Sequence, residues 1–86
     1  MKHRQLLRRL VRGALKNVSF ADFVHLVEGY GFVEIRVSGS HHLFASKGLP
    51  EMLNIQEVKG EAKPYQIRQF LRLVECYNLR LKEGIE

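Results

Sequence analysis

The chain has 86 residues, 45% of them apolar and 27% charged, and a net charge of +5. This length allows one small domain with a modest core and excludes two, and the composition excludes an intrinsically disordered chain. The single cysteine, Cys76, excludes an internal disulfide and a multi-cysteine zinc site and fits a reducing cytosol. No apolar run approaches the roughly 20 residues that are needed to cross a bilayer.

The first segment of the chain concentrates the positive charge. Residues 1–16 hold six basic and no acidic residues, a net of +6, whereas the other seventy hold eight basic and nine acidic residues, a net of −1. Residues 1–18 are expected to form a basic amphipathic helix, because "HRQLLRRLVRGALK" has helical spacing. Such a segment can serve nucleic acid, an anionic membrane or an acidic protein partner. The expected apolar face holds Leu6, Leu7, Leu10, Val11, Ala14 and Leu15, and the basic face holds Arg4, Arg8, Arg12 and Lys16.

The middle of the chain predicts a second helix and then three strands. Ser19 is expected to cap the helix, and Gly29 and Gly31 are expected to end it. Three segments alternate between apolar and polar residues and predict strands, namely "FVEIRV" (32–37), "HHLFAS" (41–46) and "EMLNIQEV" (51–58). "SGS" and "KGLP" are turn signals, and "KGEAK" is expected to be a polar loop.

A closing helix is predicted over residues 64–81. Pro64 suits the first helical position, where its missing N–H costs little. The expected core stripe holds Ile67, Phe70, Leu71, Val74, Tyr77 and Leu81. The element order α, α, β, β, β, α therefore predicts an α+β fold, with a three-stranded antiparallel sheet covered by helices on one face.

The most informative stretch is "VSGSHHLF", residues 37–44, where two histidines follow a Gly-Ser pair. Adjacent residues of a strand point to opposite faces of a sheet, so His41 and His42 cannot both face the core. An imidazole changes its protonation near neutral pH and suits general acid–base catalysis. Alternation alone does not show which of the two histidines is the catalytic candidate. His41 shares a face with Leu43 and His42 shares one with Phe44, and both of these neighbours suit a core.

The segment "DFVHLVEGYGFVEIRVSGSHHLF", followed by a third strand and a closing amphipathic helix, resembles the HicA toxins, small mRNA interferases of type II toxin–antitoxin systems. The resemblance covers residues 19–81 and is most specific where Gly39-Ser40-His41 opens the second strand. It implies a double-stranded-RNA-binding-like α-β-β-β-α domain over residues 19–86. Two features differ from the family pattern: "NIQEVKGEAK" replaces a short basic stretch that often ends strand three, and residues 1–16 look like an added helix.

The resemblance also implies a function. His41, the histidine after Gly-Ser, would be the general acid/base in cleavage of single-stranded RNA, chiefly mRNA, without a metal or cofactor. Some family members hold a histidine only at the next position, which is His42 here, so both rings are candidates. The implied protein partner is a HicB-like antitoxin, and the implied compartment is the bacterial cytoplasm. A homodimer is left open.

Supporting residues are expected in the turns and the first helix. Gly39 could let the backbone approach a phosphate and Ser40 could donate a hydrogen bond, although both also suit a simple turn. The cations expected at phosphate are Lys47, Lys59 and Lys63 in loops, and Arg4, Arg8 and Arg12 in the first helix. The apolar strip of that helix (Leu6, Leu10, Ala14) is expected to dock on the domain or on a second copy, with its arginines beside the RNA path.

Two other functions fit the same sequence. One is a non-catalytic RNA-binding or antitoxin-binding module on the same fold, which the changed end of strand three favours. The other is a protein-interaction domain whose basic helix docks on a membrane or an acidic partner. Incubation of purified protein with RNA in EDTA separates a metal-independent nuclease from both.

Overall fold

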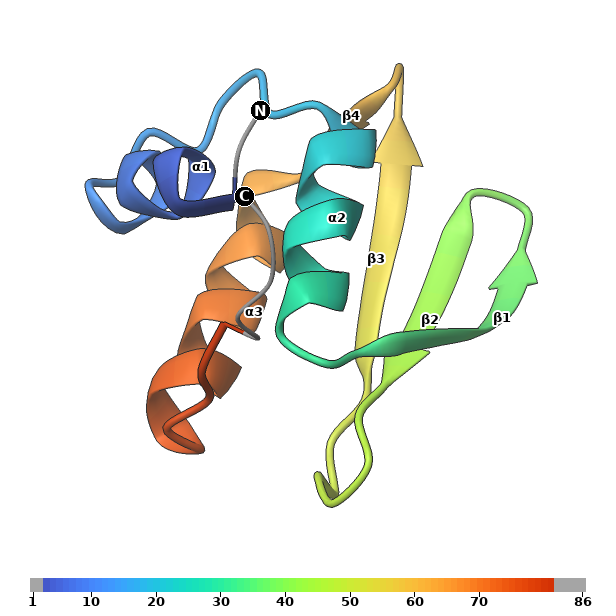
Figure 1. Cartoon of the computed structure of the whole chain (residues 1–86). Coiled ribbons are helices and arrows are strands. Elements are labelled where there is room, and N and C mark those ends of the chain that lie inside the picture. Colours follow the sequence, from blue (N-terminus) through green and yellow to red (C-terminus); the bar gives the residue numbers. More distant parts are fainter. Residues whose placement is uncertain (1–2, 82–86) are drawn as a thin grey trace.

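The computed structural model describes residues 3–81 and contains three helices and four strands (Figure 1). The helices are α1 (His3–Val11), α2 (Phe20–Gly29) and α3 (Pro64–Cys76). The strands are β1 (Val33–Ser38), β2 (His41–Ala45), β3 (Leu53–Val58) and β4 (Glu61–Ala62). They form one antiparallel sheet in the order β1-β2-β3-β4. The predicted α+β class is confirmed, with one strand more than the three predicted.

The additional strand, β4, arises from a tight hairpin within the predicted polar loop. Lys59 and Gly60 form the turn, and both have positive φ angles, of 52° and 77°, as a two-residue type I′ turn requires. Two hydrogen bonds of 2.9 Å tie the hairpin to the chain before α2, from Phe20 N–H to the Gly60 carbonyl and from Ala62 N–H to the Val18 carbonyl. The prediction of a loop was wrong for two reasons. The two residues of β4 are too few to show an alternating pattern, and the hydrogen bonds that hold the hairpin come from a distant part of the chain.

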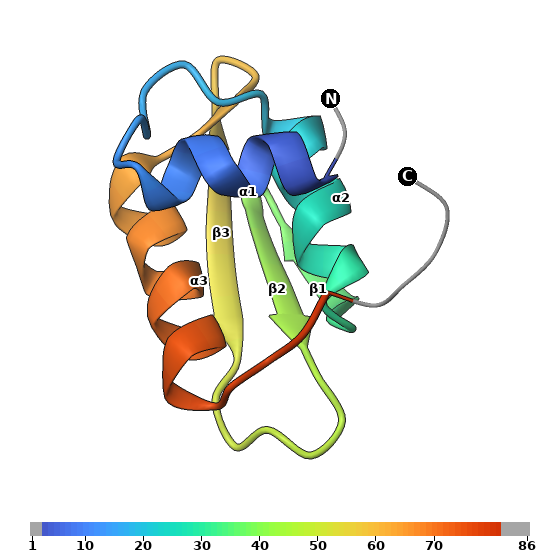
Figure 2. The same ribbon diagram turned by 60° about the vertical axis from the view of Figure 1, so that its left-hand side comes forward.

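The molecule is layered, with α2 and α3 on one face of the sheet and α1 across them on the side away from the sheet (Figures 1 and 2). Phe70 of α3 lies at the centre of the core and is fully buried. Its ring meets three others at a steep angle, with centroid distances of 5.5 Å to Phe23, 5.4 Å to Tyr30 and 6.1 Å to Phe32. Leu6 and Leu10 of α1 belong to the same core, so the added helix is part of the packed domain.

Helix α1 is shorter than predicted. It ends at Val11, and Gly13 follows with a φ of +94°, a left-handed conformation that glycine adopts without strain. The docking prediction is confirmed for Leu6 and Leu10, which are buried, but it is wrong for Ala14, which is exposed beyond the helix end.

The boundaries of the other helices follow their capping residues. The Ser19 hydroxyl accepts a hydrogen bond of 3.3 Å from Asp22 N–H, which confirms the predicted cap of α2. Helix α3 starts at Pro64 as predicted, but it ends at Cys76 and not at residue 81. Asn78 has a φ of +52°, which turns the chain out of the helix. Leu81 still packs against the core, from the irregular chain that follows.

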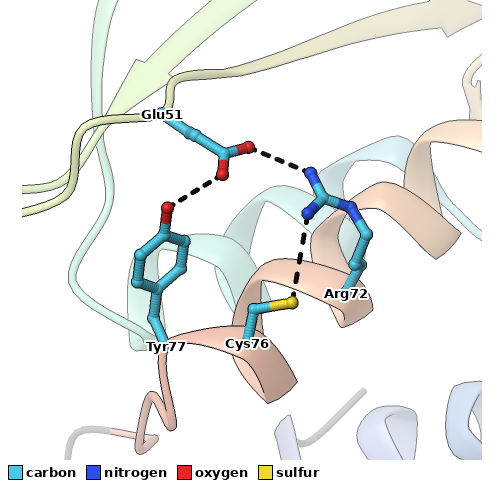
Figure 3. Close-up of polar contacts among 4 residues, drawn as sticks. All are labelled: Glu51, Arg72, Cys76 and Tyr77. Carbon is cyan, nitrogen blue, oxygen red and sulfur yellow. Dashed lines mark hydrogen bonds and ion pairs between the residues drawn. The ribbon is translucent and has the colours of Figure 1, made fainter.

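A polar cluster ties the β2–β3 loop to the end of α3 (Figure 3). The carboxylate of Glu51 accepts hydrogen bonds from the Arg72 guanidinium at 2.9 Å and from the Tyr77 hydroxyl at 2.8 Å. Those two hydrogen bonds hold the pKa of Glu51 below its usual value, the one from Arg72 having the larger effect. The sequence pattern placed Tyr77 in the core stripe of the closing helix and did not predict this cluster. No helix between residues 3 and 81 has the length and apolar character that crossing a membrane requires.

Candidate functional site

The two histidines of β2 point to opposite faces of the sheet, as alternation predicted. His42 pairs across the sheet with Ile55, which is buried beneath the helices. His41 pairs with Gln56 on β3 and with Ser38 on β1, on the face that the helices leave uncovered. We call these the helix-covered face and the open face.

His42 has the surroundings of a structural residue. Its Nδ1 lies 2.6 Å from a carboxylate oxygen of Glu34, and its ring centroid lies 4.8 Å from that of Phe20. Only 20% of its side chain is exposed. The His42 ring therefore contacts both the edge strand β1, through Glu34, and the start of α2, through Phe20.

His41 is exposed and lines a small depression of about 70 Å³ on the open face. The other lining residues are Arg36 and Ser38 from β1, Leu43 from β2 and Asn54 from β3. The depression thus combines an imidazole, a guanidinium, a hydroxyl and a carboxamide on a rigid sheet. Neither the guanidinium of Arg36 nor the carboxamide of Asn54 makes a hydrogen bond or ion pair with another described residue, so both side chains are free to meet a ligand.

A β-bulge in β1 brings Arg36 to this face. The pairing register shifts between Glu34 and Arg36, so Glu34 lies opposite Phe44 and Arg36 lies opposite Leu43. Phe44 and Leu43 are neighbours on a regular strand and point to opposite faces. The extra residue, Ile35, therefore sends Glu34 to the helix-covered face and Arg36 to the open face. Arg36 was not among the site residues expected from the sequence, because regular alternation would put Glu34 and Arg36 on the same face.

The Gly39-Ser40 turn reverses the chain between β1 and β2, and it also forms hydrogen bonds to β3. Gly39 has a positive φ of +61°, whereas the φ of Ser40 is not positive. This combination is typical of a type II′ hairpin turn. A Cβ at Gly39 would meet nothing within 4 Å, so its φ angle accounts for the glycine. The Ser40 hydroxyl accepts a hydrogen bond of 3.3 Å from the Gln56 amide, and its carbonyl accepts one of 3.0 Å from Glu57 N–H.

The predicted lysines fall at two ends of the sheet. The amine of Lys63 donates a hydrogen bond of 3.3 Å to the Gln56 carboxamide, which places it beside the strand partner of His41. Lys59 is exposed in the β3–β4 turn, at the same end of the sheet as the β1–β2 turn (Figure 1). Lys47 is exposed in the β2–β3 loop at the opposite end. The fold therefore groups Lys63 with His41 and separates Lys47 from it.

The arginines of the first segment lie away from the open face. Arg4 and Arg8 are in α1 and Arg12 directly follows it, on the helix side of the molecule (Figures 1 and 2). The fold does not bring them to His41, and their expected contact with RNA stays a prediction. Within residues 3–81 no group of three or more potential metal ligands comes together.

Fold and site together define a small α+β domain whose uncovered sheet face presents an imidazole, a guanidinium and a carboxamide in one depression. Comparison with protein-family models gives no match, and comparisons with curated proteins and with solved structures give none either. The proposals below therefore rest on the geometry and on the resemblance of the "GSHH" segment.

Proposed function

We propose that the protein is a HicA-like toxin of a type II toxin–antitoxin system, a metal-independent endoribonuclease that cleaves single-stranded mRNA in the bacterial cytoplasm. The observation that carries the proposal is the position of His41, exposed on the open face in one depression with Arg36 and Asn54. The four-stranded sheet with helices on one face is compatible with the double-stranded-RNA-binding-like fold of that family. A HicB-like antitoxin would be the protein partner.

The chemistry follows from the groups in the depression. The neutral imidazole of His41 takes the proton of the RNA 2′-hydroxyl, and the 2′-oxygen attacks the adjacent phosphorus. The bond from phosphorus to the 5′-oxygen breaks, and that oxygen takes a proton from the imidazolium or from water. The products are a 2′,3′-cyclic phosphate and a 5′-hydroxyl. The guanidinium of Arg36 stabilises the charge that develops on the phosphate oxygens, and Asn54 can hydrogen-bond a base edge or the sugar.

A non-catalytic RNA-binding or antitoxin-binding module is the second candidate. One observation favours it: the depression is lined by one imidazole and no carboxylate, so His41 has no second general acid or base beside it among the described residues. A module of this kind would use Arg36 and Lys63 for phosphate and would leave the RNA intact.

Cleavage of a labelled single-stranded RNA in EDTA tests the proposal. The wild-type protein should yield 2′,3′-cyclic phosphate and 5′-hydroxyl ends, and it should not cut the same oligonucleotide with deoxyribose at the cleavage position. His41→Ala should lower the rate by about 10²–10⁴-fold with an unchanged circular dichroism spectrum. His42→Ala should retain most of the rate.

Three results would change the assignment. Tight RNA binding without cleavage by the wild-type protein would establish the non-catalytic module. Loss of activity in His42→Ala alone would move the catalytic ring to the helix-covered face. A wild-type rate in His41→Ala would remove the proposed mechanism.

Arg36 has its own expected effect on the same reaction. Arg36→Gln should lower the cleavage rate by about 10²-fold, because it removes a cation aimed at the developing charge. Arg80→Gln, which removes an exposed cation after α3, is the matched control and should leave the rate unchanged. Equal rates in the two variants would show that Arg36 does not contact the reacting phosphate.

A further inference from the structure

The side of the molecule opposite the open face carries an apolar groove. Its walls come from α1, from the residue that follows α2 and from α3, and its volume is about 350 Å³. The lining residues are Leu7, Val11, Tyr30, Leu71, Val74 and Glu75. Five of these six are apolar or aromatic, so the groove is a hydrophobic surface of concave shape.

Within the described chain the groove is left partly uncovered. Leu7, Leu71 and Val74 are half-buried and pack against the core. Val11, at the last position of α1, is 69% exposed. A small domain gains stability by burying such side chains, and contiguous exposed apolar surface is typical of an interaction site.

The charge around the groove is uneven. Arg8 of α1 and Arg12, which directly follows α1, line a second shallow hollow together with Leu7 and Val11. Both arginines are exposed, and neither guanidinium makes a hydrogen bond or ion pair with another described residue. Burial raises the pKa of Tyr30, which lines the groove, and the charge of Arg4 partly opposes that rise. Glu75 supplies the only carboxylate among the lining residues, on the α3 side.

This combination of shape and charge selects one kind of occupant. Phosphates would not enter a groove with apolar walls, so RNA is a poor fit. A membrane surface binds protruding apolar side chains, whereas this surface is hollow. An amphipathic helix fits both features, because its apolar stripe fills a groove and its flanking charges pair with the rim.

We propose that the groove between α1 and α3 binds an amphipathic helix of a partner protein, with its apolar stripe on Leu7, Val11, Leu71 and Val74. The acidic flank of that helix faces Arg8 and Arg12, and its other flank lies along Glu75. The interaction is independent of RNA cleavage, since the groove and His41 lie on opposite sides of the molecule (Figures 1 and 2).

The probe is a synthetic helical peptide of about 14 residues, with leucines at i, i+3, i+4 and i+7 and glutamates on the flank. Added to the ¹⁵N-labelled full chain, it should shift the amide signals of Leu7, Val11, Leu71 and Val74 and leave those of β1 and β2 unchanged. A peptide with lysines in place of the glutamates should bind about tenfold more weakly, which corresponds to about 1.4 kcal/mol. A scrambled peptide of the same composition should not bind.

Two protein variants complete the test. Val11→Glu changes an exposed residue and should abolish binding of the acidic peptide without changing the circular dichroism spectrum. Arg8→Glu/Arg12→Glu should reverse the preference, so that the lysine peptide binds more tightly. Lys47→Glu/Lys59→Glu makes the same change in net charge on exposed residues elsewhere and should leave the preference as it was.

Several outcomes would overturn the proposal. Equal binding of the acidic and scrambled peptides, or binding that survives Val11→Glu, would show that the groove is not the site. If the protein binds phosphatidylglycerol vesicles but no peptide, and Val11→Glu abolishes the vesicle binding, the groove would be assigned to a membrane surface. Loss of RNA affinity in Arg8→Glu/Arg12→Glu, again without peptide binding, would return these arginines to the nucleic-acid role predicted from the sequence.

Discussion

The two faces of the sheet use the same strand for different purposes. On the helix-covered face, His42 is held by Glu34 and Phe20, and its neighbours on β2 and β3 are buried. On the open face, His41 is exposed beside an unpaired guanidinium. One imidazole is fixed and the other is available, although they are adjacent in sequence. Surroundings, and not residue type, therefore separate a structural histidine from one that is available to a ligand.

The bulge in β1 is the device that creates this difference. Because of the bulge, the carboxylate of Glu34 lies on the helix-covered face beside His42, and the guanidinium of Arg36 lies on the open face with His41. An anionic neighbour on the open face would repel phosphate, so the division of charge suits an RNA-binding surface. Substitutions on the helix-covered face should therefore change stability, whereas those on the open face should change the proposed RNA cleavage.

The largest effect is expected at the centre of the helix-covered side. Phe70→Ala should lower the free energy of unfolding by about 3–5 kcal/mol, because the ring is fully buried among three aromatic neighbours. Urea denaturation measures it. Tyr65→Ala, on the same helix but 59% exposed, is the control and should shift the midpoint only slightly. An unchanged midpoint for Phe70→Ala would contradict the packing described above.

The next effect concerns a buried amide that completes the sheet. The Gln66 side-chain carbonyl accepts a hydrogen bond of 2.7 Å from Gln56 N–H, on the part of β3 that β4 is too short to cover. Gln66→Ala leaves that N–H without its partner and should cost about 1–3 kcal/mol in urea denaturation. The control is Gln69→Ala, which changes the same residue type at a half-buried position of the same helix. Similar midpoints for both variants would mean that water replaces the Gln66 contact at little cost.

A paired measurement on the two histidines tests the comparison most directly. His42→Ala removes the contacts with Phe20 and Glu34 and should lower the free energy of unfolding by about 1 kcal/mol. His41→Ala should leave stability unchanged, since its ring is exposed. Equal losses of stability in the two variants would remove the distinction between the faces.

The smallest effect is a pH dependence outside both faces, at Glu51. Hydrogen bonds from Arg72 and then Tyr77 lower its pKa in the folded chain, so the folded state binds that proton less readily than the unfolded state. The stabilisation is therefore present above the ordinary pKa of 4.5 and is lost as the pH falls through the lower folded value. Glu51→Gln should lower the urea midpoint at pH 7, and the difference from wild type should narrow at pH values below about 4. Glu75→Gln, an exposed control, should not show this narrowing.

Local signals in the sequence determined most of the element order and the division of the two histidines. The Ser19 cap, the Pro64 start and the alternation of residues 41–46 depend on backbone chemistry and on a period of two, which are properties of a few neighbouring residues. Opposite faces for His41 and His42 follow from the same period. These predictions needed no knowledge of the rest of the chain.

Tertiary structure alone decided which histidine is covered, where Arg36 points and where the basic helix lies. The covered face depends on where α2 and α3 pack, and the bulge depends on the fit of β1 to its partner strand. Strand β4 and the position of α1 depend on contacts between residues far apart in sequence. Periodicity describes the faces of one element but not which neighbour covers them, because burial is a property of the packed molecule and not of a segment.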